Sequence, residues 1–128
     1  MTMTTLPPIS EADFQAQILD LARLTGWIAY HTRDSRGSQP GFPDLVLVRG
    51  SELLFIELKA QRGNLTAEQH EWLTALEVVA TAVDRAVLAA VEDDPAAWRD
   101  PAQPRVDVHV WRPADWPVIE RRLARSAA

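Results

Sequence analysis

The sequence contains no cysteine and only one lysine, Lys59, although it contains twelve arginines. Without cysteine, disulfide bonds and thiolate metal ligands are excluded. No apolar run approaches the roughly 18 residues of a membrane-spanning helix, and residues 1–10 lack the apolar segment of a secretion signal. We therefore expect a soluble, intracellular (cytoplasmic) protein. A length of 128 residues, with 47% hydrophobic and 24% charged, fits one globular domain, 1–128.

The net charge of −5 is concentrated in the second half of the chain. Residues 1–62 hold seven acids and six bases, whereas residues 63–128 hold eleven acids and seven bases. Proteins that bind nucleic acid usually carry a basic surplus, so the total charge argues mildly against DNA. If three acids of the first half bound a cation, however, that half would become locally positive. The charge therefore does not exclude DNA as a ligand.

Local signals in the first half predict one helix and three strands. Ser10 is a typical N-cap and Gly26 a typical helix stop, and the apolar period between them is helical. Two apolar runs joined by a short turn are typical of an antiparallel hairpin. We expect a helix at 11–25, strands at 27–31, 44–48 and 53–59, and a basic loop at 32–42.

The second half is expected to contain a helix, a strand and a final helix. Thr66 and Gln69 form a T-x-x-Q capping box, and the helix that follows either runs on or breaks near Thr81. The acidic, proline-rich segment 91–104 is typical of a surface excursion. Strand 105–111 then precedes a helix at about 116–125, with Asp115 as its cap and Val118, Ile119 and Leu123 facing inward. The predicted fold is α/β, a mixed sheet with helices in the order α–β–β–β–α–β–α.

Three charged residues of the predicted hairpin could form a catalytic site. Glu57 and Lys59 lie two residues apart on one strand, so their side chains leave the same face. Asp44 opens the neighbouring strand, and the hairpin can bring it level with them. Carboxylates suit Mg²⁺, and a lysine can help deprotonate an attacking water, which arginine cannot do. The ordinary alternatives are a solvated charge pair for Glu-x-Lys and a simple turn for Pro-Asp.

In sequence order, Gly41-x-Pro43-Asp44, Glu57-x-Lys59 and Gln69 resemble the motifs of the PD-(D/E)xK nuclease superfamily. The small, standalone, phage-like VRR-Nuc type is most similar, over residues 10–76 and again over 105–120. The resemblance implies a restriction-endonuclease-like fold and a DNA endonuclease that depends on Mg²⁺ or Mn²⁺. It assigns metal binding to Glu11, Asp44, Glu57 and the Leu58 carbonyl, and catalysis to these acids with Lys59 and Gln69.

The resemblance also implies a homodimer that acts on branched DNA such as Holliday junctions. One departure is the insertion-like segment 78–104, which is longer than the usual link into the last core strand of the family. It could be an inserted helix, a dimer contact or a lid. The alternative function is a catalytically inactive nuclease-fold module for DNA binding or assembly.

Several flanking residues have two interpretations. Glu11 is either a ligand or an acid favoured by the helix dipole, and Gln69 either a site residue or only a cap. His31 either contacts phosphate or metal or is an ordinary strand histidine, whereas His70 and His109 are expected at the surface. Trp111 and Trp116 are expected in the core. Four arginines are expected either to bind DNA phosphates near the site or, as exposed loop residues, only to keep the protein soluble. They are Arg33, Arg36, Arg49 and Arg62.

Overall fold

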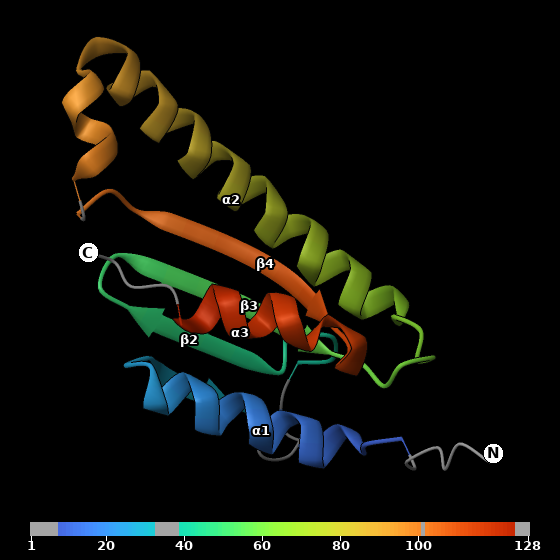
Figure 1. Cartoon of the computed structure of the whole chain (residues 1–128). Helices are drawn as coiled ribbons and strands as arrows, with labels where there is room; N and C mark the ends of the chain where they lie inside the picture. The colour runs from blue at the N-terminus through green and yellow to red at the C-terminus, as the bar shows by residue number, and fades with distance from the viewer. Residues whose placement is uncertain (1–7, 33–38, 101, 125–128) are drawn as a thin grey trace, which may run out of the picture.

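The computed structural model describes residues 8–32, 39–100 and 102–124. Its sheet has four strands in the order β1-β2-β3-β4, with β1–β2 and β2–β3 antiparallel and β3–β4 parallel (Figure 1). The strands are β1 (Ile28–His31), β2 (Leu45–Arg49), β3 (Glu52–Leu58) and β4 (Arg105–Trp111). The helices are α1 (Glu11–Leu24), α2 (Ala67–Asp93) and α3 (Trp116–Ala124), with short 3₁₀ turns η2 (Pro95–Arg99) and η3 (Pro113–Asp115). The predicted mixed α/β fold and order of elements are confirmed.

The first helix has the ends that the sequence predicts. Ser10 Oγ accepts the backbone N–H of Asp13 at 3.1 Å, which satisfies one of the free donors at the start of α1. Gly26, with φ at 91°, adopts the left-handed conformation that commonly follows a helix. Phe14 and Ile18 are buried beneath the helix. Local signals therefore fix α1 and place its apolar face against the sheet.

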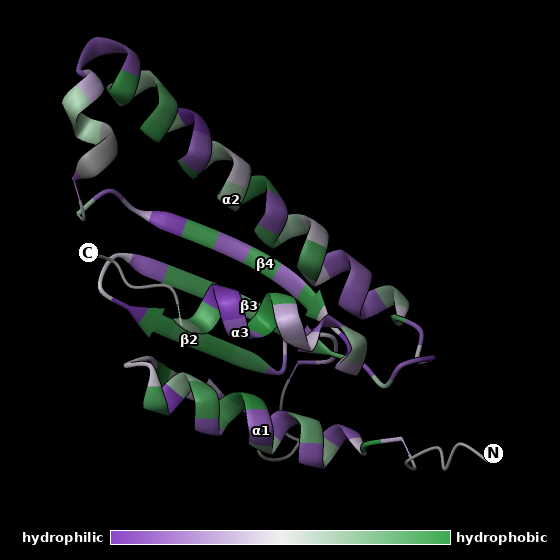
Figure 2. Cartoon of the chain, viewed as in Figure 1, coloured by the Kyte–Doolittle hydropathy of each residue, from purple (hydrophilic) through white to green (hydrophobic). Residues whose placement is uncertain are grey.

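One face of the sheet carries the main core, covered by α1 and α3 (Figure 1). The inward side chains of the hairpin are fully buried: Leu45, Leu47, Leu54 and Ile56. Figure 2 shows that β2 is apolar along almost its whole length. Burying each such side chain is worth about 1.5–3 kcal/mol, and a slip of one residue would turn all of them to the opposite face. The core therefore fixes the hairpin register on which the site depends.

Helix α2 lies on the other face of the sheet and follows the edge strand β4 (Figure 1). It runs for 27 residues without a break at Thr81, so the longer of the two predicted alternatives is correct. Its last three residues, 91–93, were expected to begin the surface excursion. The apolar period continues to Val91, which is buried, and Pro95 then prevents further helix. The segment 78–104 is thus the second half of α2 followed by η2 and a connection into β4.

The C-terminal part of the fold corrects two predictions. Asp115 does not cap α3; it belongs to η3, and its Oδ2 accepts the backbone N–H of Arg112 at 2.8 Å. Val118 is 49% exposed rather than inward, because it lies about 100° around the helix from its buried neighbour Ile119. Leu123, one turn further on, is buried as predicted.

The aromatic and histidine predictions have mixed outcomes. Trp111 is buried in the core, and Trp116 is partly buried and packs against the core, as expected. His70 is exposed, as expected, but the surface position predicted for His109 is wrong. The His109 ring is half-buried and stacks on Trp111 at 5.1 Å, because this face of β4 is partly covered. Among the described residues, no helix has both the length and the apolarity to cross a membrane.

Candidate active site

Asp44 and Glu57 are brought together by the hairpin register. Leu45 pairs with Ile56 in the antiparallel ladder, so the preceding residue, Asp44, comes level with Glu57. Asp44 Oδ2 accepts the backbone N–H of Leu58 at 2.8 Å. The carboxylate of Asp44 is thereby fixed to the end of β3. The predicted approach of the two acids is present in the structure.

Glu57 is almost completely buried, with only 2% of the residue exposed. Gln69 Nε2 donates to its Oε1 at 2.8 Å, and Lys59 Nζ lies 3.9 Å from the same oxygen. The other oxygen, Oε2, is buried and has no hydrogen-bond partner among the described residues. A buried charge is costly unless it is paired and hydrogen-bonded. Glu57 therefore has unused capacity to bind a cation or a proton.

The electrostatics of the pair follow from burial and from the short distance between the two acids, whose side chains also interact through a hydrogen bond. Burial raises the pKa of Glu57 to about 8, and the neighbouring charge of Asp44 adds to the effect. Burial also raises the pKa of Asp44, against the lowering influence of its hydrogen bonds with the Leu58 N–H and with the Glu57 carboxyl group. Two carboxyl groups in a partly dry site favour an additional positive charge, which a proton or a metal ion can provide.

Glu11 and Gln69 reach the site from the first turns of two helices. Glu11 Oε1 accepts the backbone N–H of Ala60 at 3.3 Å, directly after Lys59 in the chain. Its charge also raises the pKa of both Asp44 and Glu57. Gln69 keeps its cap role, because its Oε1 accepts the Thr66 N–H at 2.9 Å while its amide nitrogen contacts Glu57. The predicted cap is therefore confirmed, and the same side chain contacts Glu57, whereas a catalytic role for Gln69 remains a prediction.

Gly41 joins the loop that carries Asp44 to the helix that carries Gln69. Its φ is 92°, and a Cβ placed on it would lie 2.4 Å from the carbonyl of Glu68. Only glycine allows this approach. Sequence reasoning identified the G-x-P-D motif but not this contact.

Phe42, within the same motif, is a residue that sequence reasoning did not select. Its ring packs edge-on against Trp72 at 5.1 Å and Phe55 at 6.3 Å. It therefore joins the loop of the G-x-P-D motif to β3 and α2. The only available signal was an apolar residue in an otherwise polar loop.

The predicted phosphate-binding arginines have different outcomes. Arg33 and Arg36 lie outside the described residues. Arg62 is exposed in the turn after Lys59, and its contact with DNA remains a prediction. His31 ends β1 with its Nδ1 buried and without a partner among the described residues, so neither of its interpretations is excluded.

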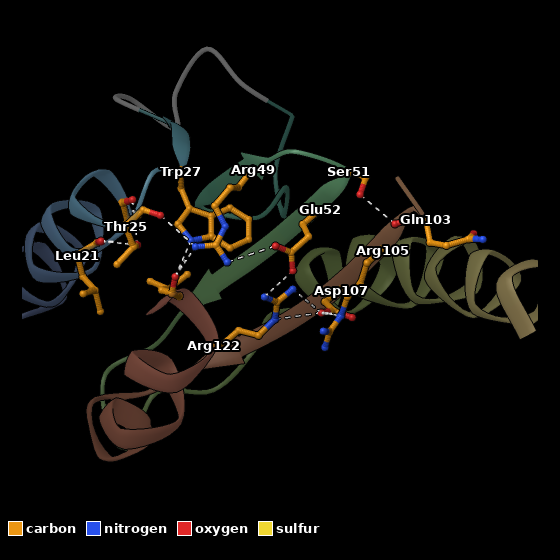
Figure 3. A network of polar contacts seen from close by, with 12 residues as sticks. Leu21, Thr25, Trp27, Arg49, Ser51, Glu52, Gln103, Arg105, Asp107 and Arg122 are labelled. Atoms are coloured by element: carbon orange, nitrogen blue, oxygen red, sulfur yellow. Dashed lines mark hydrogen bonds and ion pairs between the residues drawn. The ribbon is translucent and has the colours of Figure 1, made fainter. Parts of the chain in front are cut away.

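Arg49 is placed elsewhere, which corrects its assignment to this site. Asp44 precedes the first residue of β2, whereas Arg49 is the last residue of that strand. The guanidinium of Arg49 lies 4.2 Å from the centre of the Trp27 ring (Figure 3). Its Nη1 donates to the carbonyls of Thr25 and Leu123 at 3.0 and 2.8 Å. Strand alternation directs this side chain toward the core face covered by α1 and α3, where it holds these elements together.

The donor set of the site fits a hard divalent cation. Within residues 8–32, 39–100 and 102–124 there is no ready-made group of three or more acidic or histidine side chains around one point. The described carboxylate pair, Asp44 and Glu57, nevertheless offers oxygen ligands of the kind that Mg²⁺ and Mn²⁺ prefer. The unpartnered Oε2 of Glu57 and the raised pKa of both acids are features that a cation would relieve. Direct ligation by Glu11 and by the Leu58 carbonyl remains a prediction.

Comparison with known proteins agrees with this geometry. Residues 8–91 match the family model of the VRR-NUC domain. The match includes the five predicted catalytic residues and part of the segment 78–104, and it ends before β4 and α3. The chain matched none of the curated proteins and none of the solved structures with which it was compared. Because the family model covers well over half of the sequence, the chain belongs to the VRR-NUC family and contains a nuclease-type domain.

Proposed function

We propose that the protein is a metal-dependent DNA endonuclease that hydrolyses phosphodiester bonds by attack of water. The observation that carries the proposal is the buried carboxylate of Glu57, held level with Asp44 and left with one unpartnered oxygen among the described residues. The single lysine of the chain lies beside it. Membership of a nuclease-type family supports the same reaction class.

Each residue has a role that follows from its place. Asp44 and Glu57 would hold Mg²⁺ or Mn²⁺, which when bound supplies a Lewis acid for the phosphoryl oxygens. Lys59, with Nζ 3.9 Å from Glu57 Oε1, is placed to orient the attacking water and to neutralise charge that develops on the phosphate. Gln69 holds Glu57 through its 2.8 Å hydrogen bond.

The alternative is an inactive nuclease-fold module that binds DNA or assembles with other proteins. Such a module predicts DNA binding that weakens as salt rises, without metal-dependent cleavage. The structure brings together four residues with catalytic chemistry: Asp44, Glu57, Lys59 and Gln69. Their proximity favours a catalytically active nuclease over an inactive module.

Branched DNA as substrate and a homodimer as the active form extend the proposal. Both rest on the resemblance to the small VRR-Nuc nucleases. Ile28 and Tyr30 on the α2 side of β1 are 76% and 59% exposed, and a second copy of the chain would cover apolar side chains of this kind. Sedimentation velocity at several concentrations tests the dimer, because a monomer at all concentrations would contradict it.

The function is tested by cleavage of a labelled four-way DNA junction, a duplex and a single strand with Mg²⁺, Mn²⁺ or EDTA. Lys59→Ala and Asp44→Ala are compared with Arg121→Ala, a change of an exposed arginine on α3. Circular dichroism first establishes that each variant folds. We expect metal-dependent cleavage that both site variants lose and the control keeps. Cleavage that survives both substitutions, or no cleavage by the wild type, would overturn the proposal.

A further inference from the structure

Arg112 connects the C-terminal part of the chain to the turn that follows Lys59. It lies between β4 and η3, outside the residues that match the family model. Its Nη1 donates to the carbonyl of Ala60 at 2.8 Å and to the carbonyl of Gly63 at 2.7 Å. The Ala60 carbonyl also accepts the Gly63 N–H at 3.0 Å. One guanidinium nitrogen thus binds both ends of the turn 60–63.

Neighbouring contacts hold the same two segments together. The Lys59 N–H donates to the Trp111 carbonyl at 3.1 Å. Gln61 Oε1 accepts the backbone N–H of Ala114 at 3.0 Å. The carboxylate of Asp115 fixes the backbone N–H of Arg112 itself. The residues that follow β4 are therefore held against the residues that follow β3 by these contacts in addition to the two that the guanidinium makes.

The turn 60–63 in turn lies against Lys59. A Cβ placed on Gly63 would meet Lys59 Cδ at 3.4 Å, so the backbone of Gly63 approaches the aliphatic part of the lysine closely. The N–H of Ala60 donates to Glu11 Oε1 at 3.3 Å. The lysine side chain is only 13% exposed. The position of the turn therefore limits where the ammonium group of Lys59 can reach.

We infer that Arg112 is a positioning residue for the candidate active site, because it holds the turn 60–63 against Lys59 and keeps the ammonium group beside Glu57. Its effect on catalysis rests on the proposed function, whereas its effect on Lys59 does not. Arginine suits this task because the two hydrogens of a planar Nη1 diverge in fixed directions toward two carbonyls. A lysine at this position would keep the charge but not the fixed geometry.

The first test measures the order of the Lys59 side chain directly. Because the chain contains one lysine, incorporation of ¹³C-lysine gives the side chain of a single residue in the NMR spectrum. We expect the order parameter at Cε to fall in Arg112→Gln and in Arg112→Met, neither of which adds a lysine, and to stay unchanged in the control Arg121→Gln. Backbone amide spectra establish that each variant is folded. An unchanged Lys59 order parameter in either folded Arg112 variant would overturn the inference.

The second test measures the catalytic consequence. Misplacing a catalytic group costs roughly tenfold or more in rate, so we expect kcat of Arg112→Gln to fall by about that factor while KM for DNA stays near the wild-type value. A raised KM with unchanged kcat would instead make Arg112 a DNA contact. If the wild type cleaves no DNA, the proposed function fails. The NMR order parameter of the Lys59 side chain still tests whether Arg112 positions Lys59.

Discussion

Gln69 donates its amide N–H to Glu57 Oε1 over 2.8 Å, while the oxygen of the same amide accepts the backbone N–H of Thr66. One side chain therefore both begins α2 and orients the buried carboxylate. Because the cap fixes the oxygen end of the amide, its NH₂ end is directed at Glu57. The start of α2 and the end of β3 are joined at the candidate site by this residue.

Gln69→Leu separates the two roles when it is compared with Thr66→Ala. Loss of the Thr66 cap should cost about 1 kcal/mol of unfolding free energy and leave cleavage close to wild type. Gln69→Leu should also lower metal affinity or cleavage by roughly 10-fold to 100-fold, because Glu57 loses its hydrogen-bond donor. Urea unfolding and single-turnover cleavage measure the two effects. Equal losses of cleavage in both variants would show that only the cap matters.

Gly41→Ala should destabilise the protein more than Gly50→Ala. Gly50, with φ at 58°, has open space within 4 Å of where a Cβ would lie, so its substitution adds only backbone strain of about 1–2 kcal/mol. At Gly41 a Cβ would cause the same kind of backbone strain and would also clash with the backbone of Glu68. We expect the loop of Asp44 and the start of α2 to move apart. Urea unfolding measures the difference, and similar losses at both positions would contradict the packing argument.

Glu57 should make the metal-free protein less stable as pH rises. Its folded pKa of about 8 lies above the ordinary value of 4.5, so the folded state retains a proton that the unfolded state releases. The free energy of unfolding should therefore fall between about pH 4.5 and 8 and level off above that range. The lowered pKa of His109, caused mainly by burial, acts in the opposite direction. Urea unfolding in EDTA should show this fall as the difference between wild type and Glu57→Gln, and parallel curves would contradict it.

Metal binding should release protons at neutral pH. Because Glu57 is largely protonated below about pH 8, a cation that binds its carboxylate must displace that proton. Calorimetry with Mg²⁺ or Mn²⁺ in buffers of different ionisation enthalpy should report release of about one proton at pH 7, and affinity should rise with pH. A binding enthalpy that does not depend on the buffer would contradict the displacement of a proton from Glu57 by the ion.

Arg122→Ala should destabilise the fold without acting on the site. Arg122 is buried and pairs with Glu52 at 3.0 Å and with Asp107 at 2.9 Å, at the end of the sheet shown in Figure 3. Removing it leaves two partly buried carboxylates without this partner, at a cost of about 3 kcal/mol. The exposed Arg121→Ala should change stability by less than about 0.5 kcal/mol. Thermal unfolding compares the two, and equal melting temperatures would show that the buried pairs contribute little.

Local sequence signals were sufficient for most of the secondary structure. Ser10, the Thr66–Gln69 capping box and Gly26 define helix ends because each satisfies or terminates backbone groups within a few residues. The two apolar runs and the short turn between them predict the hairpin formed by β2 and β3. The register of that hairpin brings Asp44 level with Glu57, so the central pair of the site was also predictable.

The tertiary structure decided the environment of those residues. The burial of Glu57 and its raised pKa depend on the packing of distant segments around it, among them the start of α2 with Gln69, which no pattern around Glu57 describes. Arg49, Arg122 and His109 are covered because α3 returns to the sheet, although their sequence neighbours suggest exposed positions. Arg112 meets the turn after Lys59 across about fifty residues of chain, because the parallel pairing of β4 with β3 brings their ends together. Sequence alone determined the elements and the acidic pair, whereas desolvation and contacts between distant segments, which exist only after folding, determined the charge state and positioning of the site.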